Sequence, residues 1–484
     1  MNFLIYCSII KKKQEIAKIC LSEIDKSLFV SYTEKTVENT VCNRLIGLGK
    51  EDNYDTDKNG NQFNNGIQQG SDCPHDSFIN ILCHDWTILH LWIQRCFFAL
   101  IFKQRSTMSE RNYMKTVNGI YASAKVFTDT IEDYALAQIR MLCDNEAFCD
   151  SKIRIMPDVH PGKVGTIGFT ATVGKQILPN VVGVDIGCGI TMAKLKQKRA
   201  EFQKIDAVIR ETIPAGSRIR NKAHRFADGF DFNRLNCRKA IHKEKAIRSL
   251  GSLGGGNHFI ELDQDRQGGL YVVIHSGSRH LGTEVTEYYL REGQKRLKSK
   301  GEEIPYELTY LEGDLRDAYL EDLQTVQEFA AKNRETILDE LVKGMKWKVT
   351  DTFSSVHNYV DLSGSVPIMR KGAVSAQKGE TVIIPVNMRD GVILGKGLGN
   401  ADWNYSAPHG AGRIMKREDV KHNYTVSEFK KEMKGIYSSC IGADTLDEAP
   451  FAYRGIEEIR EAIGDTVEIK EILKPVYNYK AGKS

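Results

Sequence analysis

Leu270-Tyr271-Val272-Val273-Ile274-His275 is a continuous hydrophobic run that ends in a histidine. A run of this length predicts a buried β-strand. The segments 164–173 and 181–185, separated by Gly and Pro, predict short strands, and 381–386 predicts another. Amphipathic spacing predicts helices at 128–143 and 320–343. Strands and helices alternate without regular βαβ spacing, and this pattern favours a single large α+β domain.

Composition places the chain among globular proteins. Of its 484 residues 41% are hydrophobic and 27% charged, which provides core enough for an enzyme. A net charge of +4 permits nucleic-acid binding but does not argue for it. The 11 cysteines form no CxxC pair and no cleavable signal peptide is evident, so we expect a reducing, cytoplasmic compartment. The hydrophobic run at 91–102 is too short to span a bilayer, so no membrane is expected as a partner.

The first part of the chain differs from the rest. Residues 52–72 are rich in Asn, Asp, Gly and Gln, a composition typical of loops and disordered segments. We therefore expect residues 1–107 to be a partly disordered N-terminal extension of unknown role, and residues 108–484 to form the catalytic domain. Upstream sequence read through to an alternative start at Met108 would explain the extension.

Several polar clusters on Gly-rich turns or strand ends point to a metal site. Asp185 and Cys188 lie three residues apart in a glycine-rich turn, and a carboxylate with a thiolate suits Mn, Zn or Fe better than Mg or Ca. His275 ends the hydrophobic run, where a strand would hold a ligand rigidly. Each residue alone also fits a buried structural role. Together they predict a metal centre with the ligands Asp185, Cys188, His258, His275 and His357.

Two glycine-rich segments suit an anion. The glycines of 251–256 let backbone amides approach a phosphate, although this loop is neither a Walker motif nor a dinucleotide fingerprint. The second segment, Tyr405–Arg413, places His409 in small residues with Arg413 four positions on. Because histidine can act as a nucleophile as well as a base, His409 is the candidate catalytic residue.

Basic runs at 218–225 and 238–245, followed by Arg248, suit a nucleic-acid backbone, with a solvated helix face as the alternative. A smaller basic element, Arg370–Ala373, lies next to the expected strands.

Taken together, the motifs resemble the RtcB family of RNA ligases, and their order along the chain is that of the family. The resemblance covers residues 108–484 and does not include 1–107. It rests on Pro157–His160, Val184–Gly189, Gly256–Glu261, His275–Arg279, His357–Tyr359, Arg370–Ala373 and His409–Arg413.

The resemblance implies GTP-dependent joining of an RNA 3′-phosphate or 2′,3′-cyclic phosphate to a 5′-hydroxyl, in tRNA splicing or RNA repair. His409 would attack the α-phosphate of GTP and give a covalent histidine–GMP intermediate. Two Mn²⁺ ions would be held by the five ligands named above. RNA with these ends and GTP would be the partners, and an accessory activating protein is a further candidate partner. The guanylate-binding positions implied are Asn257, Glu261, Asn358, Asn387, Met388, Gly410, Ala411, Gly412 and Lys480.

The chain departs from the family pattern at Val386–Gly391, where many members read Gly-Ser-Met-Gly. Asn387 keeps a hydrogen-bonding group, Arg389 adds charge, and Val392 stands where a serine is expected. Pro408 precedes the nucleophile where a small polar residue is common. These changes indicate a divergent branch and bear on guanine selectivity.

Two other functions remain as alternatives. One is a metal-dependent RNA end-processing hydrolase that opens 2′,3′-cyclic phosphates without ligation. The other is a non-catalytic RNA-binding protein.

Overall fold

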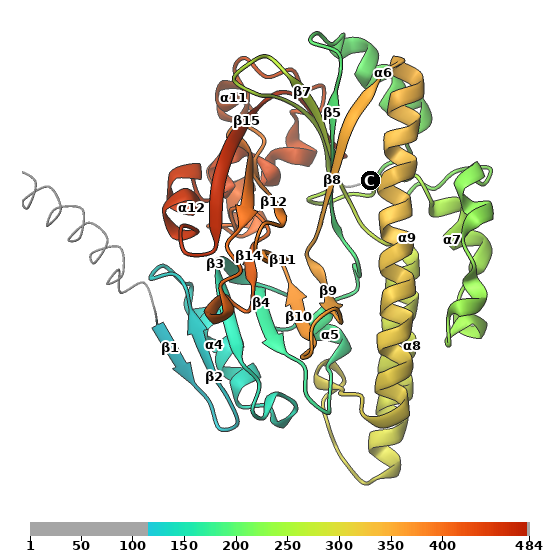
Figure 1. Cartoon of the computed structure of the whole chain (residues 1–484), viewed down its shortest axis with the longest axis vertical. Coiled ribbons are helices and arrows are strands. Elements are labelled where there is room, and N and C mark those ends of the chain that lie inside the picture. Colours follow the sequence, from blue (N-terminus) through green and yellow to red (C-terminus); the bar gives the residue numbers. More distant parts are fainter. Residues whose placement is uncertain (1–114, 482–484) are drawn as a thin grey trace, which may run out of the picture. The chain divides into compact units, whose positions relative to one another are not determined.

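The hydrophobic run at 270–275 forms most of strand β7, Leu270–Ser276, an interior strand of a seven-stranded sheet (Figure 1). The computed structural model describes residues 115–481, so the expectations for 1–107 lie outside the described residues. All neighbouring strands of this sheet are antiparallel. In spatial order the strands are β12 (Thr381–Asn387), β13 (Gly391–Gly397), β15 (Val467–Lys480), β6 (Phe259–Gln264), β7, β5 (Gly189–Leu195) and β8 (Val349–Val356).

This sheet has two buried faces and it curls. In β5, Ala193 and Leu195 share a hydrophobic cluster with Ile337 of helix α9 (Gly313–Met345). The alternate residue Met192 packs instead with Ile383 of β12, from the far end of the sheet. Because side chains alternate along a strand, a strand buried on both faces reads as a continuous hydrophobic run.

A second sheet of six strands carries the motif residues Asp158 and His160. Strands β2 and β3 are parallel, and the register of β3 against β4 is irregular between Ile155 and His160. The order is β1 (Lys115–Asn118), β2 (Ser123–Val126), β3 (Ile153–Pro161), β4 (Thr166–Thr172), β10 (Ile368–Lys371) and β9 (Asn358–Asp361). A two-stranded sheet pairs β11 (Ala373–Ser375) with β14 (Ser406–Pro408).

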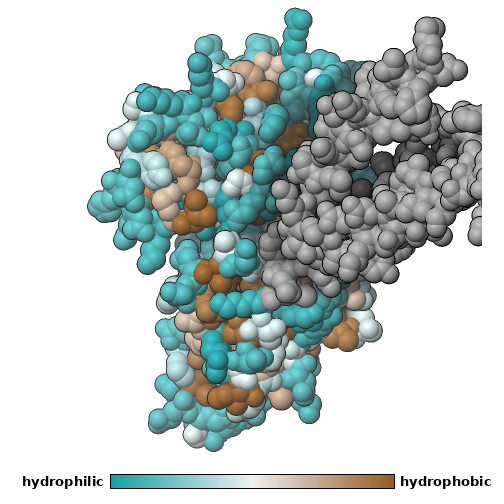
Figure 2. Space-filling model, turned by 90° about the vertical axis from the view of Figure 1, so that its left-hand side faces the viewer, coloured by the Kyte–Doolittle hydropathy of each residue, from teal (hydrophilic) through white to brown (hydrophobic). Residues whose placement is uncertain are grey.

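Helices α8 (Arg279–Ser299) and α9 run side by side along the sheets (Figure 1). The other α-helices of the described residues are α4 (Asp133–Cys143), α5 (Pro179–Val182), α6 (Phe202–Thr212), α7 (Lys243–Ser249), α10 (Arg417–Asn423), α11 (Val426–Glu432) and α12 (Ile456–Ala462). Within residues 115–481, none of the helices combines the length and the hydrophobicity that crossing a membrane requires. Figure 2 shows hydrophilic residues over much of the described part of one face, with small hydrophobic groups among them.

The α+β prediction is confirmed, and so are the strands expected at 270–275 and 381–386. The strand expected at 181–185 is wrong, because Pro179 starts the short helix α5 and Gly183, with φ of 95°, ends it in a turn. The expected helix at 128–143 begins only at Asp133, and that at 320–343 extends to 313–345. Arg370–Ala373 was expected beside a strand as a basic element, but Arg370 lies within β10 and is fully buried.

Candidate metal centre and nucleotide cavity

Four neighbouring strands of the seven-stranded sheet end at the same place. The register pairs Gly189 at the start of β5 with Ser276 at the end of β7 and with Val356 at the end of β8. It also pairs Phe259 at the start of β6 with His275. Since strands β6, β7, β5 and β8 are adjacent, this pairing gathers the residues at their ends. They are His258, His275, Cys188 and His357.

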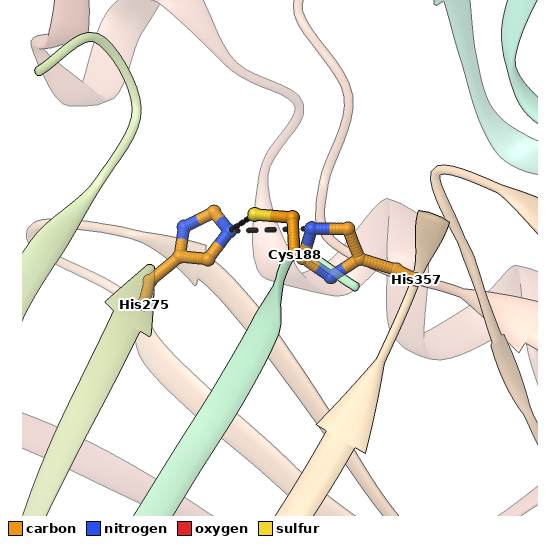
Figure 3. Close-up of side chains that lie close together, drawn as sticks. All are labelled: Cys188, His275 and His357. Carbon is orange, nitrogen blue, oxygen red and sulfur yellow. Dashed lines mark hydrogen bonds between the residues drawn. The ribbon is translucent and has the colours of Figure 1, made fainter. Parts of the chain in front are cut away.

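The gathered side chains contact one another directly. Figure 3 shows His275 and His357 beside Cys188, with the imidazoles turned toward each other. The Cys188 Sγ lies 3.3 Å from His275 Nε2 and 3.4 Å from His258 Nε2. His275 Nε2 lies 3.2 Å from His357 Nε2, and Asp185 Oδ2 lies 3.1 Å from His258 Nε2. Two metal-ligand groups result, Cys188–His275–His357 and Asp185–Cys188–His258, and they share the cysteine.

Hydrogen bonds fix which ring nitrogens point inward. His258 Nδ1 lies 2.9 Å from the carbonyl of Leu253, and His275 Nδ1 lies 3.2 Å from that of Asn257. Since a carbonyl oxygen accepts an N–H, a neutral ring that donates from Nδ1 presents the lone pair of Nε2 toward the Cys188 sulfur, where a metal ion would bind. Burial also lowers the pKa of His275 and of His357 well below the usual range, so both imidazoles are neutral. This donor set fits one or two divalent ions of the Mn or Zn type.

Helix α9 supports the turns that carry the candidate metal ligands. Asn333 donates to the carbonyls of Ser252 and Gly277 and accepts from the backbone N–H of Gly251. The fully buried Arg334 donates to the carbonyls of Gly187 and Ser276 and to the Thr191 hydroxyl. A rigid helix therefore holds the loops that carry the candidate ligands.

His409 follows β14 directly and is held by Asp158 from the irregular part of β3. Its Nδ1 lies 2.7 Å from Asp158 Oδ2, which also accepts the backbone N–H groups of His409 and Gly410 at 3.2 Å. The Asp158 carboxylate is fully buried. Because a carboxylate accepts an N–H, the Nδ1 carries the proton and Nε2 keeps its lone pair. The His409 ring centroid lies 4.8 Å from that of His357, so the nucleophile candidate adjoins the metal centre.

At Gly412, near His409, the backbone leaves no room for a side chain. Gly412 has φ of 73°, and a Cβ there would lie 2.3 Å from the carbonyl oxygen of Asp158. The loop can thus lie against β3 only because this residue is glycine.

An open cavity of about 350 Å³ adjoins His409. It is lined by eight of the nine predicted guanylate-binding residues, namely Asn257, Glu261, Asn387, Met388, Gly410, Ala411, Gly412 and Lys480. The ninth, Asn358, lies elsewhere, because its side chain donates to the Asp185 carbonyl and accepts from the Gly372 backbone N–H. Asn358 therefore positions two loops of the site.

The Asn387 side chain is already engaged within its own loop. Its amide donates to Asp390, and its oxygen accepts the backbone N–H groups of Arg389 and Asp390. Arg389 in turn forms ion pairs with Asp390 and Glu432. Val392 is fully buried in the core of the sheet. The residues at 386–392 that depart from the family pattern thus form a closed turn beside the cavity.

A buried network of charged residues lines another side of the cavity. Glu448 is almost fully buried and accepts from Lys480, Arg417 and Tyr453. Arg413, which lies 3.4 Å from Glu448, completes the network. Although burial alone would raise the pKa of Glu448, the charges of Lys480, Arg417 and Arg413 lower it to about 2.

Asp158, His160, Glu448 and Asn478 are among the residues that shape this site but were not predicted as site residues. The motif Pro157–His160 was noted in the sequence, and its carboxylate two residues from a histidine was the available signal. Glu448 and Asn478 carried no such signal, because their role depends on partners far away in the sequence.

The basic run at 218–225 is partly turned inward. Arg220 pairs with Glu340 of α9 at 3.2 Å, and Arg225 pairs with Asp339 at 2.7 Å. This segment is no α-helix, so the solvated helix face proposed as the alternative is absent there. These two arginines are engaged with α9 in the described residues.

Comparison with known proteins agrees with this geometry. A family model described as tRNA-splicing ligase RtcB matches residues 138–234 and 218–481. RNA-splicing ligase RtcB1 of Escherichia coli (strain ATCC 25922) is 31% identical over 368 residues, covering 68% of this chain and 90% of that protein. RNA-splicing ligase RtcB of Escherichia coli (strain K12) is 30% identical with the same coverage. tRNA-splicing ligase RtcB of Nanoarchaeum equitans is 26% identical, covering 70% of this chain and 90% of that protein.

The family model spans most of the described residues and includes the metal-ligand groups, His409 and the cavity wall at Lys480. The sequence motifs, the strand-end cluster and the comparisons agree on one assignment. This chain belongs to the RtcB family of RNA ligases.

Proposed function

We propose that the protein is a GTP- and Mn²⁺-dependent RNA ligase that joins a 3′-phosphate or 2′,3′-cyclic phosphate end to a 5′-hydroxyl end. The observation that supports this proposal most directly is the position of the His409 ring and its hydrogen bond. Its Nδ1 is bound to the buried Asp158, its Nε2 lone pair is free to react, and its ring lies between the nucleotide-sized cavity and the metal-ligand cluster. The relatives named as RNA-splicing and tRNA-splicing ligases support the substrate class.

In the first step, Nε2 of His409 forms a bond to the α-phosphorus of GTP and pyrophosphate leaves. The Nδ1 proton stays on the imidazole, and the Asp158 carboxylate offsets the positive charge that develops on the ring. An oxygen of the RNA 3′-phosphate then attacks the same phosphorus, and the bond to Nε2 breaks. Where the RNA ends in a 2′,3′-cyclic phosphate, water first opens the ring to give this 3′-phosphate. Finally the 5′-hydroxyl attacks the activated 3′-phosphate, its proton passes to solvent and GMP leaves, which closes the phosphodiester.

Asp185, Cys188, His258, His275 and His357 would hold the ions, with Cys188 shared between two sites. When bound, such ions offset phosphate charge and lower the pKa of a bound water or hydroxyl. The thiolate and three imidazoles favour Mn²⁺ over Mg²⁺, because Mg²⁺ binds oxygen ligands almost exclusively.

Guanine recognition rests on Glu261. Its buried carboxylate lines the cavity and accepts two parallel donors, as the N1–H and amino group of guanine provide. Adenine presents an acceptor at N1 and is therefore disfavoured at this position.

The proposal is tested with α-labelled GTP, and with ATP in parallel, in the presence of Mn²⁺ and on a denaturing gel. A covalent label that requires Mn²⁺ and is absent in His409→Ala supports it. Absence of label in a protein that binds Mn²⁺ would instead favour the end-processing hydrolase. That enzyme would convert a 2′,3′-cyclic phosphate to a 3′-monophosphate without joining ends.

Metal binding is tested apart from activity. We expect Cys188→Ser to lose most of the Mn²⁺ that remains after gel filtration, because the shared sulfur belongs to both ligand groups. Cys149→Ser, at an exposed cysteine, is the matched control and should retain the metal content of the wild type. Equal metal in both variants would show that Cys188 is not a ligand.

A further inference from the structure

A second carboxyl group lies behind Glu261, and the proposed mechanism does not use it. Glu261 and Asp263 are two residues apart in β6, so their side chains lie on the same face of the strand. Both are buried, with 3% and 0% of their surface exposed. The two carboxyl groups lie within hydrogen-bonding reach of each other.

Two buried carboxylates in contact cannot both be ionised at low cost, because each loses its hydration and repels the other. One proton shared between them removes the repulsion and adds a hydrogen bond. Burial and the neighbouring Glu261 raise the pKa of Asp263 well above its usual range. The pair therefore holds one proton near neutral pH.

The surroundings decide which residue carries that proton. Burial raises the pKa of Glu261 to about 7, whereas the Asn478 side-chain amide, which donates to it at 2.5 Å, and the charge of Lys480 favour its ionised form. Neither oxygen of Asp263 receives an N–H or a hydroxyl donor from the described residues, and no cation stabilises it. The proton belongs on Asp263, which then donates to Glu261 and leaves Glu261 ionised.

Asn478 adds a second observation at the same place. It is 1% exposed, it lines the cavity, and its Oδ1 has no donor among residues 115–481. The orientation of its amide is fixed, because a flipped amide would turn its oxygen toward the Glu261 carboxylate. An unpartnered buried acceptor thus stands beside an ionised carboxylate at the cavity wall.

We propose that Asp263 is a positioning residue for base selection. It holds a proton that keeps Glu261 ionised, so that Glu261 and Asn478 together present only acceptors to the base. This inference rests on the proposed function, since it assigns the recognition of guanine within the same cavity. The N1–H and amino group of guanine supply the donors that these acceptors lack, whereas hypoxanthine lacks the amino group.

The test compares two nearly isosteric variants, Asp263→Asn and Asp263→Leu. Asn keeps a donor toward Glu261 but has no proton to lose, whereas Leu supplies no donor. The readout is the KM for covalent labelling by GTP and by inosine triphosphate, with Mn²⁺ held constant. We expect Asp263→Asn to keep the GTP preference of the wild type. We expect Asp263→Leu to raise the KM for GTP about tenfold and to reduce the preference for GTP over inosine triphosphate. The reason is that the Glu261 carboxylate loses the donor that stabilises its ionised form.

Unchanged preference in Asp263→Leu would overturn the inference, and so would an equal loss in both variants. Should Asp263→Leu not fold, infrared difference spectra of wild type against Asp263→Asn decide the question. Loss of a protonated-carboxyl band in the Asn variant is expected, and an undiminished band would show that the proton resides on Glu261. A wild type that GTP does not label at all would contradict the proposed function, whereas the infrared result would still test the proton on Asp263.

Discussion

At the scale of single residues, the tautomer of His409 determines whether the nucleophile that we propose can attack phosphorus. Only a ring nitrogen with a lone pair can attack, and the Asp158 carboxylate keeps that lone pair on Nε2. The same oxygen accepts two backbone N–H groups, so one buried carboxylate fixes both the ring and its loop.

Asp158→Asn removes the charge but not the acceptor. The amide oxygen can take the place of Oδ2 and accept the same three N–H groups, but no negative charge then offsets the positive charge that develops on the ring. We expect the rate of covalent labelling by GTP to fall about 10²- to 10³-fold. Rapid-quench labelling at saturating GTP measures this rate.

Bound Mn²⁺ and the thermal midpoint serve as controls for Asp158→Asn, and both should match the wild type. A labelling rate close to that of the wild type would show that the charge of Asp158 does not contribute to the proposed transfer.

At the scale of secondary structure, the sequence predicted elements better than their arrangement. The hydrophobic run at 270–275 could be predicted as a strand because it is buried on both faces. The strand predicted at 181–185 is wrong. Valines are typical of strands, but Pro179 just before them favours the start of a helix. The candidate ligands could be named from the sequence, Cys188 among them. That Cys188 belongs to two groups could not, because only the strand register brings His258 and His357 to it.

Arg334 of helix α9 joins the turn before β5 to the end of β7. Arg334→Met removes the donors of the carbonyls of Gly187 and Ser276 and of the Thr191 hydroxyl, which leaves buried acceptors unpaired. We expect the free energy of unfolding to fall by about 3 kcal/mol, measured by urea denaturation of the metal-free protein. Glu335→Ala, the next residue of the helix, removes only an exposed pair with Lys332 and should change it by less than about 0.5 kcal/mol.

At the scale of the whole molecule, the groups that shape the site within the described part of the chain belong to residues 158–480. We propose that residues 108–484 form the catalytic unit. A chain that starts at Met108 is expected to label with GTP at the same KM as the full chain, measured side by side. A clear loss of labelling in a folded Met108 chain would assign the first 107 residues a part in catalysis.

Histidines whose pKa is lowered in the folded protein make its free energy of unfolding depend on pH. Burial lowers the pKa of His160 to about 4 and that of His275 and His357 well below 6.5. Between the folded and unfolded pKa values the unfolded chain binds more protons, so acid favours unfolding and stability falls with falling pH. This loss begins near pH 6.5 and continues through the folded values.

His160 offers the cleanest test of this dependence, because it is not among the candidate metal ligands. From pH 7.5 to pH 5 its contribution to the free energy of unfolding should fall by about 2 kcal/mol. His160→Gln, in chelator-treated protein, should lose about that much of the pH dependence in urea titrations. His422→Gln, at an exposed position of α10, should keep the full dependence. If both variants keep it, the acid sensitivity comes from other groups, and His160 is protonated in the folded protein as readily as in the unfolded chain.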